Sequence, residues 1–593
     1  MELEKVKDVF DLFVSADVIQ LQPKQPGYKA DGVVLQAIEK LKIHKQNTLH
    51  VLLNDTTDAP VIAVDIETTA KHFLDGDIRL ISMYSTDMQI VTPDVEEVVS
   101  ILGDPQICKI FHNAAFDVTW LKAKGFEVTN YTDTMVMAQI VHNTTKSTNS
   151  LKALAFEYFG EVLNKDKQST ENWQGELSQE HRDYALKDAE ITFRLYQALS
   201  EEIKTKHLDV VLAREIRALP AVIELSLNGI PFDYSGWQVV LDEMQKEVDG
   251  LENEIKNHFK LSDLLLTSPK QLLDAFATVG IILTSTKEEE LAKHESKHPV
   301  IAKVCRYKRL KKRISTYGEG LKAKIQPNGR VYGNWRLIGT DTSRMSCKNP
   351  NLQGLPTQAK QFVKAPEGKT FIVADYSTIE LRILAEITRD EKMVQAFTEG
   401  EDLHRKTAQG IFNLDSVEQV SKEERQIGKV VNFGLIYGMT SYGLQKRITA
   451  ATGKSISLQK AASFRDNYFK FYPSVLLYQD SMLKADVIQT LGGRYWGEGL
   501  KALKKGSIAR YNYPIQGTGA EGMKNALALL LERKPTEWKL IAAIHDEIVL
   551  EVPIGQAELA KEVLQNTMQE GMQQLIPSIQ IEIDINICSK WTK

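Results

Sequence analysis

The stretch Phe371–Arg382, FIVADYSTIELR, constrains the fold of this chain more than any other. Its first four residues are apolar and predict a short buried strand that ends at Asp375. A second carboxylate, Asp546, occurs in KLIAAIHDEIVLEVP, where two apolar runs predict a hairpin with His545, Asp546 and Glu547 at its tip. Carboxylates at the ends of adjacent strands can hold hard cations. The two segments therefore predict a two-metal site for phosphoryl transfer, with Glu547 beside it.

Length and composition set broad limits on the chain. At roughly 150 residues per domain, 593 residues predict three or four domains. The formal net charge of −5 does not indicate a nucleic-acid binder unless the basic residues cluster locally. The four cysteines are far apart without metal-ligand spacing, which suits a reducing compartment. No apolar run approaches the ~18 residues of a membrane span, and the N-terminus does not read as a signal peptide, so we expect a cytoplasmic protein.

Three segments in the first third of the chain carry acidic residues that suit metal binding. VIAVDIETT predicts a strand ending in two acids, KIFHNAAFDVTWL a strand followed by a helix, and HRDYALKDAEITFRLY a helix. The acids are Asp65, Glu67, Asp117 and Asp188. Tyr184 lies four residues before Asp188 on the same helix face, where it can hydrogen-bond an attacking water. Any one of these acids is more simply a solvated surface group, but the set in this order predicts a site for two divalent ions.

The three segments resemble the three motifs of the DnaQ-like 3′–5′ exonucleases. This resemblance implies an RNase H-like fold, a mixed sheet flanked by helices, and a catalytic role for Asp65, Glu67, Asp117, Tyr184 and Asp188. Asp133, in YTDTMVMAQ, stands where that family often has an acid. We interpret Asp133 as structural support rather than as a metal ligand.

The middle of the chain predicts helices. ALPAVIELSLNGIPFD favours an amphipathic helix closed by Gly229, and SPKQLLDAF favours a helix that begins at a Ser-Pro boundary. Apolar residues recur at spacings of three and four from Leu241 to Ile255, which is typical of a long helix with a coiled-coil-like seam. KVCRYKRLKKR places seven basic residues among the eleven from Lys303 to Arg313. Such a run is usually a solvated face, but in an acidic protein it can grip phosphate backbones.

The segment SKEERQIGKVVNFGLIYG predicts a helix with an unusual stripe. Ser421 and Glu424 form a capping box at its start, and Gly438 marks its end. Every fourth residue falls on one stripe about 18 Å long: Arg425, Lys429, Phe433 and Tyr437. Two cations followed by aromatic rings match a triphosphate followed by a base. A core face beside a solvated face would not explain why cations and aromatics share this stripe.

This helix, SPKQL, RISTYGEGL, TDTSRMSCKNPNLQGLP and DYSTIELR resemble segments of the family A DNA polymerases, the DNA polymerase I group. Together the two resemblances cover the chain from residue 60 to its end and imply an α/β multidomain (α+β) fold. They imply an RNase H-like exonuclease domain followed by a right-hand polymerase of thumb, palm and fingers. We expect a lead-in at 1–55, the exonuclease domain at 56–205, the thumb at 206–335, the palm at 336–400 and 505–593, and the fingers at 401–504. The lead-in is too short for a 5′-nuclease domain.

The polymerase resemblance assigns roles around the nucleotide. Asp375 and Asp546 would bind the metal ions, and Glu380 would be the steric gate against a ribose 2′-hydroxyl. Arg425, Lys429 and His404 would neutralise the triphosphate, and Lys429 would also protonate the leaving pyrophosphate. Phe433 would face the 3′ side of the sugar, and Tyr437 would stack near the templating base.

The same resemblance assigns DNA contacts, and some departures from the family pattern lie close to the proposed contacts. Arg344, Asn512, Gln516 and His545 would contact the primer and the minor groove. Ser343 stands for the usual Gly, Cys347 for Ser, Thr378 for Gln, and Ile508 for an arginine of some members. Arg510 or Lys505 is a candidate to replace that arginine.

The resemblance implies Mg²⁺, two ions per active site with Mn²⁺ as a substitute, and primer-template DNA and dNTPs as substrates. We expect a monomer that works with replication accessory proteins. The sequence leaves open a host repair enzyme or a phage replicase, and the short lead-in favours a phage. Two other hypotheses are a pure nuclease with a degenerate C-terminal half and a structural replication factor with two inactive sites. Intact Asp375, Lys429 and Asp546 argue against both.

Overall fold

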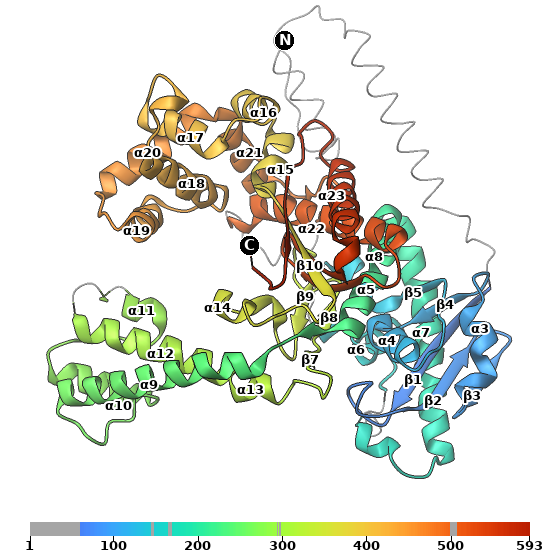
Figure 1. The fold of residues 1–593 in the computed structure, drawn as a ribbon. Coiled ribbons are helices and arrows are strands. Elements are labelled where there is room, and N and C mark those ends of the chain that lie inside the picture. The colour runs from blue at the N-terminus through green and yellow to red at the C-terminus, as the bar shows by residue number, and fades with distance from the viewer. Residues whose placement is uncertain are drawn as a thin grey trace, which may run out of the picture.

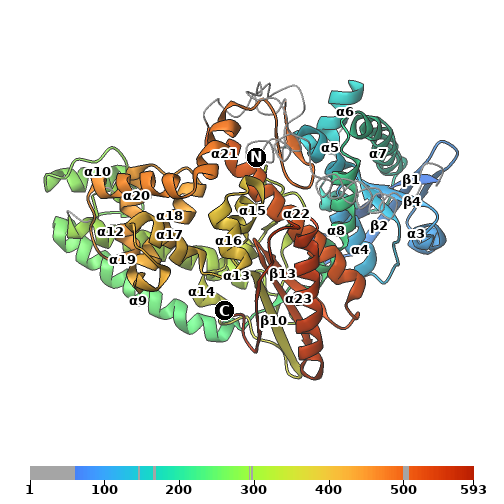
Figure 2. The same ribbon diagram turned by 90° about the horizontal axis from the view of Figure 1, so that it is seen from above.

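The computed structural model describes residues 60–143, 147–163, 169–292, 294–295, 298–497 and 507–592, so the expected lead-in at 1–55 lies outside the described residues. Figure 1 shows an N-terminal sheet domain, a central sheet with long helices beside it, and two helical arms. Both arms extend to the same side of the central sheet, as the second view in Figure 2 also shows. Among these residues, no helix combines the length and the apolar composition that crossing a membrane requires.

The N-terminal domain is built on a five-stranded mixed sheet of order β3-β2-β1-β4-β5. Its strands are β1 (Val61–Thr68), β2 (Ile78–Tyr84), β3 (Gln89–Thr92), β4 (Cys108–Phe111) and β5 (Tyr131–Asp133). β1 pairs antiparallel with β2 and parallel with β4. The helices are α3 (Val99–Gly103), α4 (Ala114–Ala123), α5 (Thr134–His142), α6 (Leu151–Phe159) and α7 (Gln179–Thr205). α7 packs across β1, β2 and β3 and so lies beside the strand that carries Asp65 and Glu67.

The central sheet has the order β13-β14-β10-β15, with every neighbouring pair antiparallel. Its strands are β10 (Lys369–Tyr376), β13 (Lys539–Ile544), β14 (Glu547–Pro553) and β15 (Ile583–Cys588). The predicted hairpin is confirmed, since β13 and β14 leave only His545 and Asp546 in the turn. α22 (Ala509–Arg533) and α23 (Ala557–Gln573) pack on each other, and α23 covers β10 and β15. The buried apolar run of β10 ends near the C-terminal end of the strand, where Asp375 lies.

The first arm consists of helices that follow β10. They are α15 (Ile379–Thr388), α16 (Glu391–Thr398), α17 (Leu403–Phe412), α18 (Lys422–Ile436), α19 (Ser441–Thr452), α20 (Leu458–Phe471) and α21 (Pro473–Lys484), with a short hairpin of β11 (Ile488–Gln489) and β12 (Tyr495–Trp496). The predicted capping box is confirmed: Ser421 Oγ accepts from Glu424 N, and Glu424 Oε2 accepts from Ser421 N. α18 ends before Gly438, which adopts a φ of 67°.

The second arm consists of α9 (Tyr234–Phe259), α10 (Pro269–Thr278), α11 (Glu288–Ala292), α12 (Pro299–Tyr317) and α13 (Glu319–Lys322). α9 and α12 pack along each other, and the predicted seam is buried at Leu241, Met244, Val248 and Ile255, while Leu251 is half-buried. Ser268 caps α10 with Pro269 as its first residue, as the Ser-Pro boundary predicts.

The helix α8 (Asp209–Asn228) follows α7 and precedes this arm. It packs on α22 and β13 of the central part and on α4 of the N-terminal domain. α8 therefore joins these two parts, and the expected domain boundary at residue 206 stays a prediction. The remaining short elements are β6 (Ile230–Pro231), β7 (Arg330–Val331), β8 (Asn334–Arg336), β9 (Ser346–Lys348) and α14 (Thr357–Lys360).

Candidate active sites

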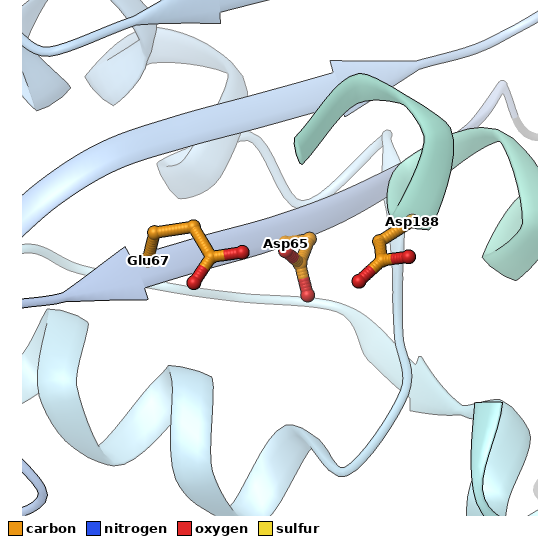
Figure 3. A group of neighbouring side chains, drawn as sticks. All are labelled: Asp65, Glu67 and Asp188. Atoms are coloured by element: carbon orange, nitrogen blue, oxygen red, sulfur yellow. The ribbon is translucent and has the colours of Figure 1, made fainter. Parts of the chain in front are cut away.

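The N-terminal domain brings together three of its four predicted acids. Asp65 and Glu67 lie two residues apart on β1 and therefore on one face, and Asp188 faces them from α7 (Figure 3). One carboxylate oxygen of each lies within 4.8 Å of the others. Asp117, at the start of α4, is tied to the same strand because its Oδ1 accepts from Ile66 N at 3.3 Å.

Crowding and burial make this cluster unfavourable without a cation. Burial, and then the charges of its acidic neighbours, raises the pKa of Asp65 well above its ordinary value. The same causes raise the pKa of Glu67 to about 9, with Asp188 and Asp117 as the neighbouring charges. Oxygen-only donors of this kind are the ligands that hard divalent cations prefer. The residues present therefore fit a site for divalent metal ions.

Tyr184 and Asp133 take the positions expected of them. Tyr184 lies one turn before Asp188 on the same helix, and burial together with that carboxylate raises the pKa of its phenol, which stays neutral. Asp133 caps α5, since its Oδ1 accepts from Met135 N at 2.8 Å. It also accepts from Asn113 N at 3.0 Å and Ala114 N at 2.9 Å. The interpretation of Asp133 as structural support is confirmed.

A second site lies where the central sheet meets α17 and α18. A cavity of about 840 Å³ occupies this place. Among its lining residues are Arg344, Asp375, Glu380, His404, Arg425, Lys429, Phe433, His545 and Asp546. Tyr376 N donates to the Asp546 carbonyl at 3.1 Å, which holds the hairpin tip against the end of β10. The carboxylates of Asp375 and Asp546 therefore share this cavity with two cations of α18, Arg425 and Lys429.

Sequence reasoning missed Asp584, a further acid beside Asp375. Asp584 of β15 pairs directly with Asp375 of β10, and both line the cavity. The alternation in IEIDINIC was a signal for an exposed acidic face, but only the strand pairing places that face beside Asp375. Glu582 also lines the cavity and forms an ion pair with Arg382 at 2.7 Å.

Glu547 lies beside this site and not among the cavity-lining residues, as expected. Its Oε1 accepts from Lys360 Nζ at 3.0 Å and from Trp591 Nε1 at 2.9 Å. The Lys360 ammonium also lies 4.3 Å from the centre of the Trp591 ring. Glu547 is thus a buried acid whose partners come from α14 and from the C-terminal segment.

The cationic side of the cavity is held by hydrogen bonds to fixed partners. Arg425 Nε lies 2.6 Å from Asp402 Oδ2. Asn432 Nδ2 lies 3.1 Å from His404 Nδ1, and Asn432 Oδ1 accepts from Thr407 Oγ1 at 3.0 Å. The amide therefore donates to Nδ1, which leaves the proton of a neutral His404 on Nε2.

The surroundings of His404 disfavour its charged form in the absence of a nucleotide. Burial, opposed by Asp402 and reinforced by Arg425 and Lys429, lowers the pKa of His404 to about 4. The imidazole is therefore neutral at pH 7 before a nucleotide binds. The predicted share of His404 in neutralising the triphosphate concerns the nucleotide-bound state and stays a prediction.

Tyr437, the last residue of the predicted stripe, lies near Glu380, the predicted steric gate. Glu380 accepts from Arg344 Nη2 at 2.7 Å, and its carboxylate lies close enough to the Tyr437 hydroxyl to affect the pKa of that group. Burial, together with the Glu380 carboxylate, raises the pKa of Tyr437. Phe433 lines the cavity one turn beyond Lys429, with its ring centre 5.8 Å from that of His404. Tyr437 is not among the described cavity-lining residues.

The predicted minor-groove residues lie on α22 and in the hairpin turn. Asn512 is largely buried, and its Oδ1 has no hydrogen-bond partner among the residues that the structure describes. Gln516 follows one turn later, and His545 lies in the turn with a φ of 55°. Asn512 and Gln516 are not among the residues described as lining the cavity.

The departures from the family pattern have structural consequences. Thr378 lines the cavity with a φ of 50°, a conformation unusual for a β-branched residue. Cys347 is buried, with its Sγ 3.4 Å from the Pro350 carbonyl. Arg510 is buried and its Nε donates to the Met482 carbonyl at 3.0 Å, and its replacement of the missing arginine at Ile508 stays a prediction. Lys505, the other candidate, lies outside the described residues.

The chain is similar in sequence and in fold to known DNA polymerases. A family model described as "DNA polymerase family A" matches residues 237–593, and one described as "3'-5' exonuclease" matches residues 41–204. The DNA polymerase I of Aquifex aeolicus is 28% identical over 575 residues, which cover 90% of this chain and 96% of that protein. The thermostable DNA polymerase I of Thermus thermophilus is 31% identical over 435 residues, which cover 67% of this chain.

The chain spans most of the Aquifex protein but only 50% of the Thermus protein and 57% of the DNA polymerase I of Pseudomonas aeruginosa. A solved structure described as the POL domain of Pol1 from M. smegmatis in complex with DNA primer-template and dNTP shares the fold. Its TM-score is 0.78 at 22% identity, over 92% of this chain and 98% of that chain.

These matches cover both halves of the chain and confirm the predicted fold class, an exonuclease domain followed by a polymerase domain. The relatives named above are bacterial, so a phage origin stays a prediction. The chain belongs to DNA polymerase family A, resembles the DNA polymerase I enzymes, and carries a 3′–5′ exonuclease domain ahead of its polymerase domain.

Proposed function

We propose that the chain extends the 3′ end of a primer with dNTPs directed by a DNA template, and removes misincorporated nucleotides in its exonuclease domain. The observation that carries this proposal is the cavity in which Asp375 and Asp546 face Arg425 and Lys429. Two anionic groups beside two cationic groups suit a bound metal-triphosphate, since the acids hold the metal and the cations hold the phosphates.

The metal ligands that we propose for this cavity are Asp375 and Asp546, with Asp584 close enough to assist. Their oxygen donors fit Mg²⁺ or Mn²⁺. When bound, such ions would supply the positive charge that favours an ionised primer 3′-hydroxyl and a compact triphosphate. The pairing of Asp375 with Asp584 across β10 and β15 supports a rigid acidic edge for this purpose.

On the opposite wall, Arg425 and Lys429 bind the triphosphate, and Lys429 donates a proton to the leaving pyrophosphate. His404 adds a hydrogen bond from Nε2. Glu380 fills the space that a ribose 2′-hydroxyl would occupy, and Phe433 faces the sugar. Arg344, Asn512, Gln516 and His545 contact the primer side of the duplex.

In the exonuclease domain, Asp65, Glu67, Asp117 and Asp188 are the proposed ligands of two divalent ions. Tyr184 keeps its proton, because of its raised pKa, and orients the attacking water by a hydrogen bond. The buried, proton-sharing acids support this role, since such a cluster gains most from a cation.

The right-hand arrangement is part of the proposal. The arm of α9–α13 would belong to the thumb, and α17–α21 of the other arm would be the fingers. The central sheet with α15, α16, α22 and α23 would be the palm. The packing of α8 on α22 and β13 supports placing this helix with the palm, so the thumb would begin at α9. The Pol1 relative was solved with primer-template and dNTP, which supports the same substrates here.

The test is extension of a labelled primer on a longer template with four dNTPs and Mg²⁺. The proposal predicts full-length product, and shortened primer when dNTPs are omitted. A pure nuclease would shorten the primer under both conditions, and a structural replication factor would leave it unchanged. Action in the cytoplasm as a monomer with accessory proteins, and an origin in a phage, remain predictions beyond this test.

A further inference from the structure

The turn that carries Arg344 is fixed by a buried polar cluster that the proposed reaction does not use. Ser343, immediately before Arg344, has no exposed surface and a φ of 65°. The resembling family A segment has glycine at this position, and glycine adopts such a φ without strain. A serine in the same conformation costs conformational energy. The penalty indicates that its side chain does something that glycine could not.

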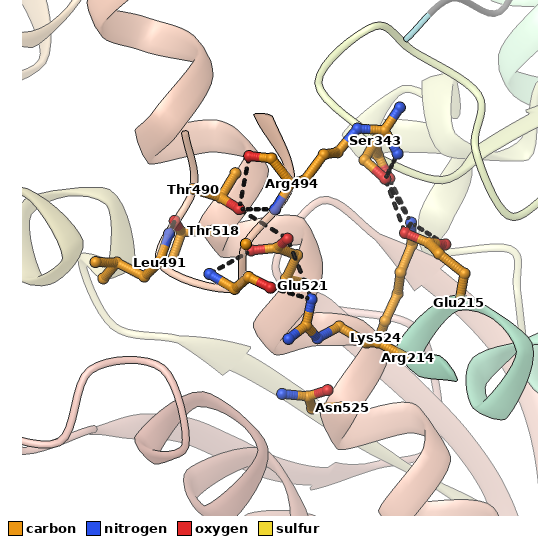
Figure 4. Close-up of polar contacts among 12 residues, drawn as sticks. Arg214, Glu215, Ser343, Thr490, Leu491, Arg494, Thr518, Glu521, Lys524 and Asn525 are labelled. Carbon is orange, nitrogen blue, oxygen red and sulfur yellow. Dashed lines mark hydrogen bonds and ion pairs between the residues drawn. The ribbon is translucent and has the colours of Figure 1, made fainter. Parts of the chain in front are cut away.

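The Ser343 hydroxyl uses its full hydrogen-bonding capacity. It donates to Glu215 Oε1 at 3.0 Å, and accepts from Arg494 Nη1 at 3.2 Å and from Lys524 Nζ at 2.9 Å. Lys524 Nζ also donates to the Ser343 carbonyl at 2.7 Å, so both the side chain and the peptide are held. Figure 4 shows these three partners converging on Ser343 from different elements.

The three partners of Ser343 are themselves deeply buried. Lys524 Nζ lies 2.7 Å from both carboxylate oxygens of Glu215. Burial lowers the pKa of Lys524 to about 8, while the Glu215 carboxylate favours its charged form. Arg494 has 1% of its surface exposed, and its Nε has no hydrogen-bond partner among the described residues. The guanidinium therefore depends on few acceptors, of which the Ser343 hydroxyl is one.

Arg494 connects this cluster to the exonuclease domain. Its Nη2 donates to the Gln139 carbonyl of α5 at 3.2 Å. Gln139 Nε2 lies 3.5 Å from the Ile338 carbonyl, so the same residue also contacts the start of the segment that leads to Arg344. The turn itself is tight, because Arg344 N donates to Thr340 Oγ1 at 3.1 Å.

We propose that Ser343 is a positioning residue that fixes Arg344 toward the primer and ties the primer-contacting turn to the exonuclease domain through Arg494. This inference rests on the proposed primer contact of Arg344. Because the hydroxyl and the carbonyl of Ser343 are both held, the peptide that leads into Arg344 cannot rotate freely. Loosening it would weaken the hold of the polymerase site on a matched primer end, and the end would reach the exonuclease site more often.

The experiment compares Ser343→Ala, Ser343→Gly, Arg344→Ala and the double variant Ser343→Ala/Arg344→Ala. For each variant, one measures KM for matched primer-template, kcat, and the ratio of dNMP released to dNTP incorporated. We expect Ser343→Ala to raise KM and the excision ratio by about tenfold, with degradation of single-stranded DNA unchanged. We expect Ser343→Gly to lose as much, since it removes the hydroxyl while accepting the positive φ.

The double variant tests whether Ser343 acts through Arg344. We expect its KM to equal that of Arg344→Ala alone, because no positioned side chain then remains. Additive losses, or wild-type KM and excision in Ser343→Gly, would overturn the inference and leave the cluster a source of stability only. If Ser343→Ala unfolds, as its thermal midpoint would show, Ser343→Gly and Arg344→Ala decide the matter.

The design also separates this inference from the function it rests on. Arg344→Ala with unchanged primer extension would remove the proposed primer contact, and the positioning role with it. A defect in Arg344→Ala without a defect in either Ser343 variant would overturn the positioning role alone.

Discussion

Arg344 Nη2 lies 2.7 Å from Glu380 Oε1, so the side chain assigned to the primer and the side chain assigned to the nucleotide sugar form an ion pair in one wall of the cavity. The Tyr437 hydroxyl lies near the same carboxylate, and burial together with that charge raises its pKa. Glu380 is therefore held in place before a nucleotide arrives, and a rigid side chain rejects an extra hydroxyl better than a mobile one.

Glu380→Ala should raise incorporation of rNTPs relative to dNTPs by about tenfold or more, since ~1.4 kcal/mol of lost discrimination gives that factor. The measurement is single-nucleotide insertion of matched rNTP and dNTP. Glu380→Gln is the matched control, because it keeps the volume of the side chain and removes only its charge. A gate that acts by volume keeps rNTP rejection in the Gln variant. An unchanged ratio in Glu380→Ala would place the gate elsewhere, with Thr378 the first residue to test.

Phe433→Tyr should relax discrimination against chain-terminating ddNTPs. The 3′-hydroxyl of a dNTP can hydrogen-bond its own β-phosphate, and a ddNTP leaves that acceptor poorly solvated at a cost of about 1–3 kcal/mol. A tyrosine hydroxyl at this position of the cavity wall can replace the missing donor. We expect about a tenfold gain or more in relative ddNTP insertion.

This ratio is measured in an Asp65→Ala background, so that excision does not remove the product. Normal dNTP insertion with an unchanged ddNTP ratio would mean that the stripe from Arg425 to Tyr437 does not face the sugar.

Glu67→Gln should stabilise the exonuclease domain in the absence of metal ions, and more so at higher pH. The pKa of Glu67 is about 9 in the folded protein against 4.5 for an ordinary glutamate, so the folded state holds more protons between these values. The stability that protonated Glu67 allows is therefore fully present below about pH 4.5. It is lost as the pH rises through about 9, where the buried carboxyl ionises. A glutamine has no charge to bury.

The measurement is the thermal midpoint of both proteins in EDTA from about pH 5 to about pH 9, followed by titration with Mg²⁺. The difference between the two should grow with pH, and Mg²⁺ should stabilise the wild type more than the variant. A difference that is constant with pH would mean that Glu67 is already ionised without metal.

The local elements of both sites could be predicted from the sequence because their signals are local. The capping box at Ser421 and the fourfold spacing from Arg425 define α18, and the apolar runs around Asp546 define its hairpin. Asp65 and Glu67 are two residues apart on a strand, and Tyr184 and Asp188 are four apart on a helix, so each pair was predicted to share a face.

Other features depend on contacts between distant segments, and no local pattern encodes them. Asp584 belongs to the site because β15 pairs with β10. The neutrality of His404 follows from its burial, which is a property of the folded protein. The partners of Ser343 come from α8, α22 and the residue that precedes β12, so the sequence showed only that a glycine was missing.

If one chain carries two separate active sites, variants of one site should leave the activity of the other intact. Asp65→Ala with Glu67→Ala should abolish degradation of a primer 3′ end and leave its extension near normal, because these acids lie on β1, in another domain from the cavity. Asp546→Asn should abolish extension and leave degradation near normal, because an amide lacks the anionic oxygen that a hard cation requires. Loss of both activities from either change, in a protein that remains folded, would contradict the account.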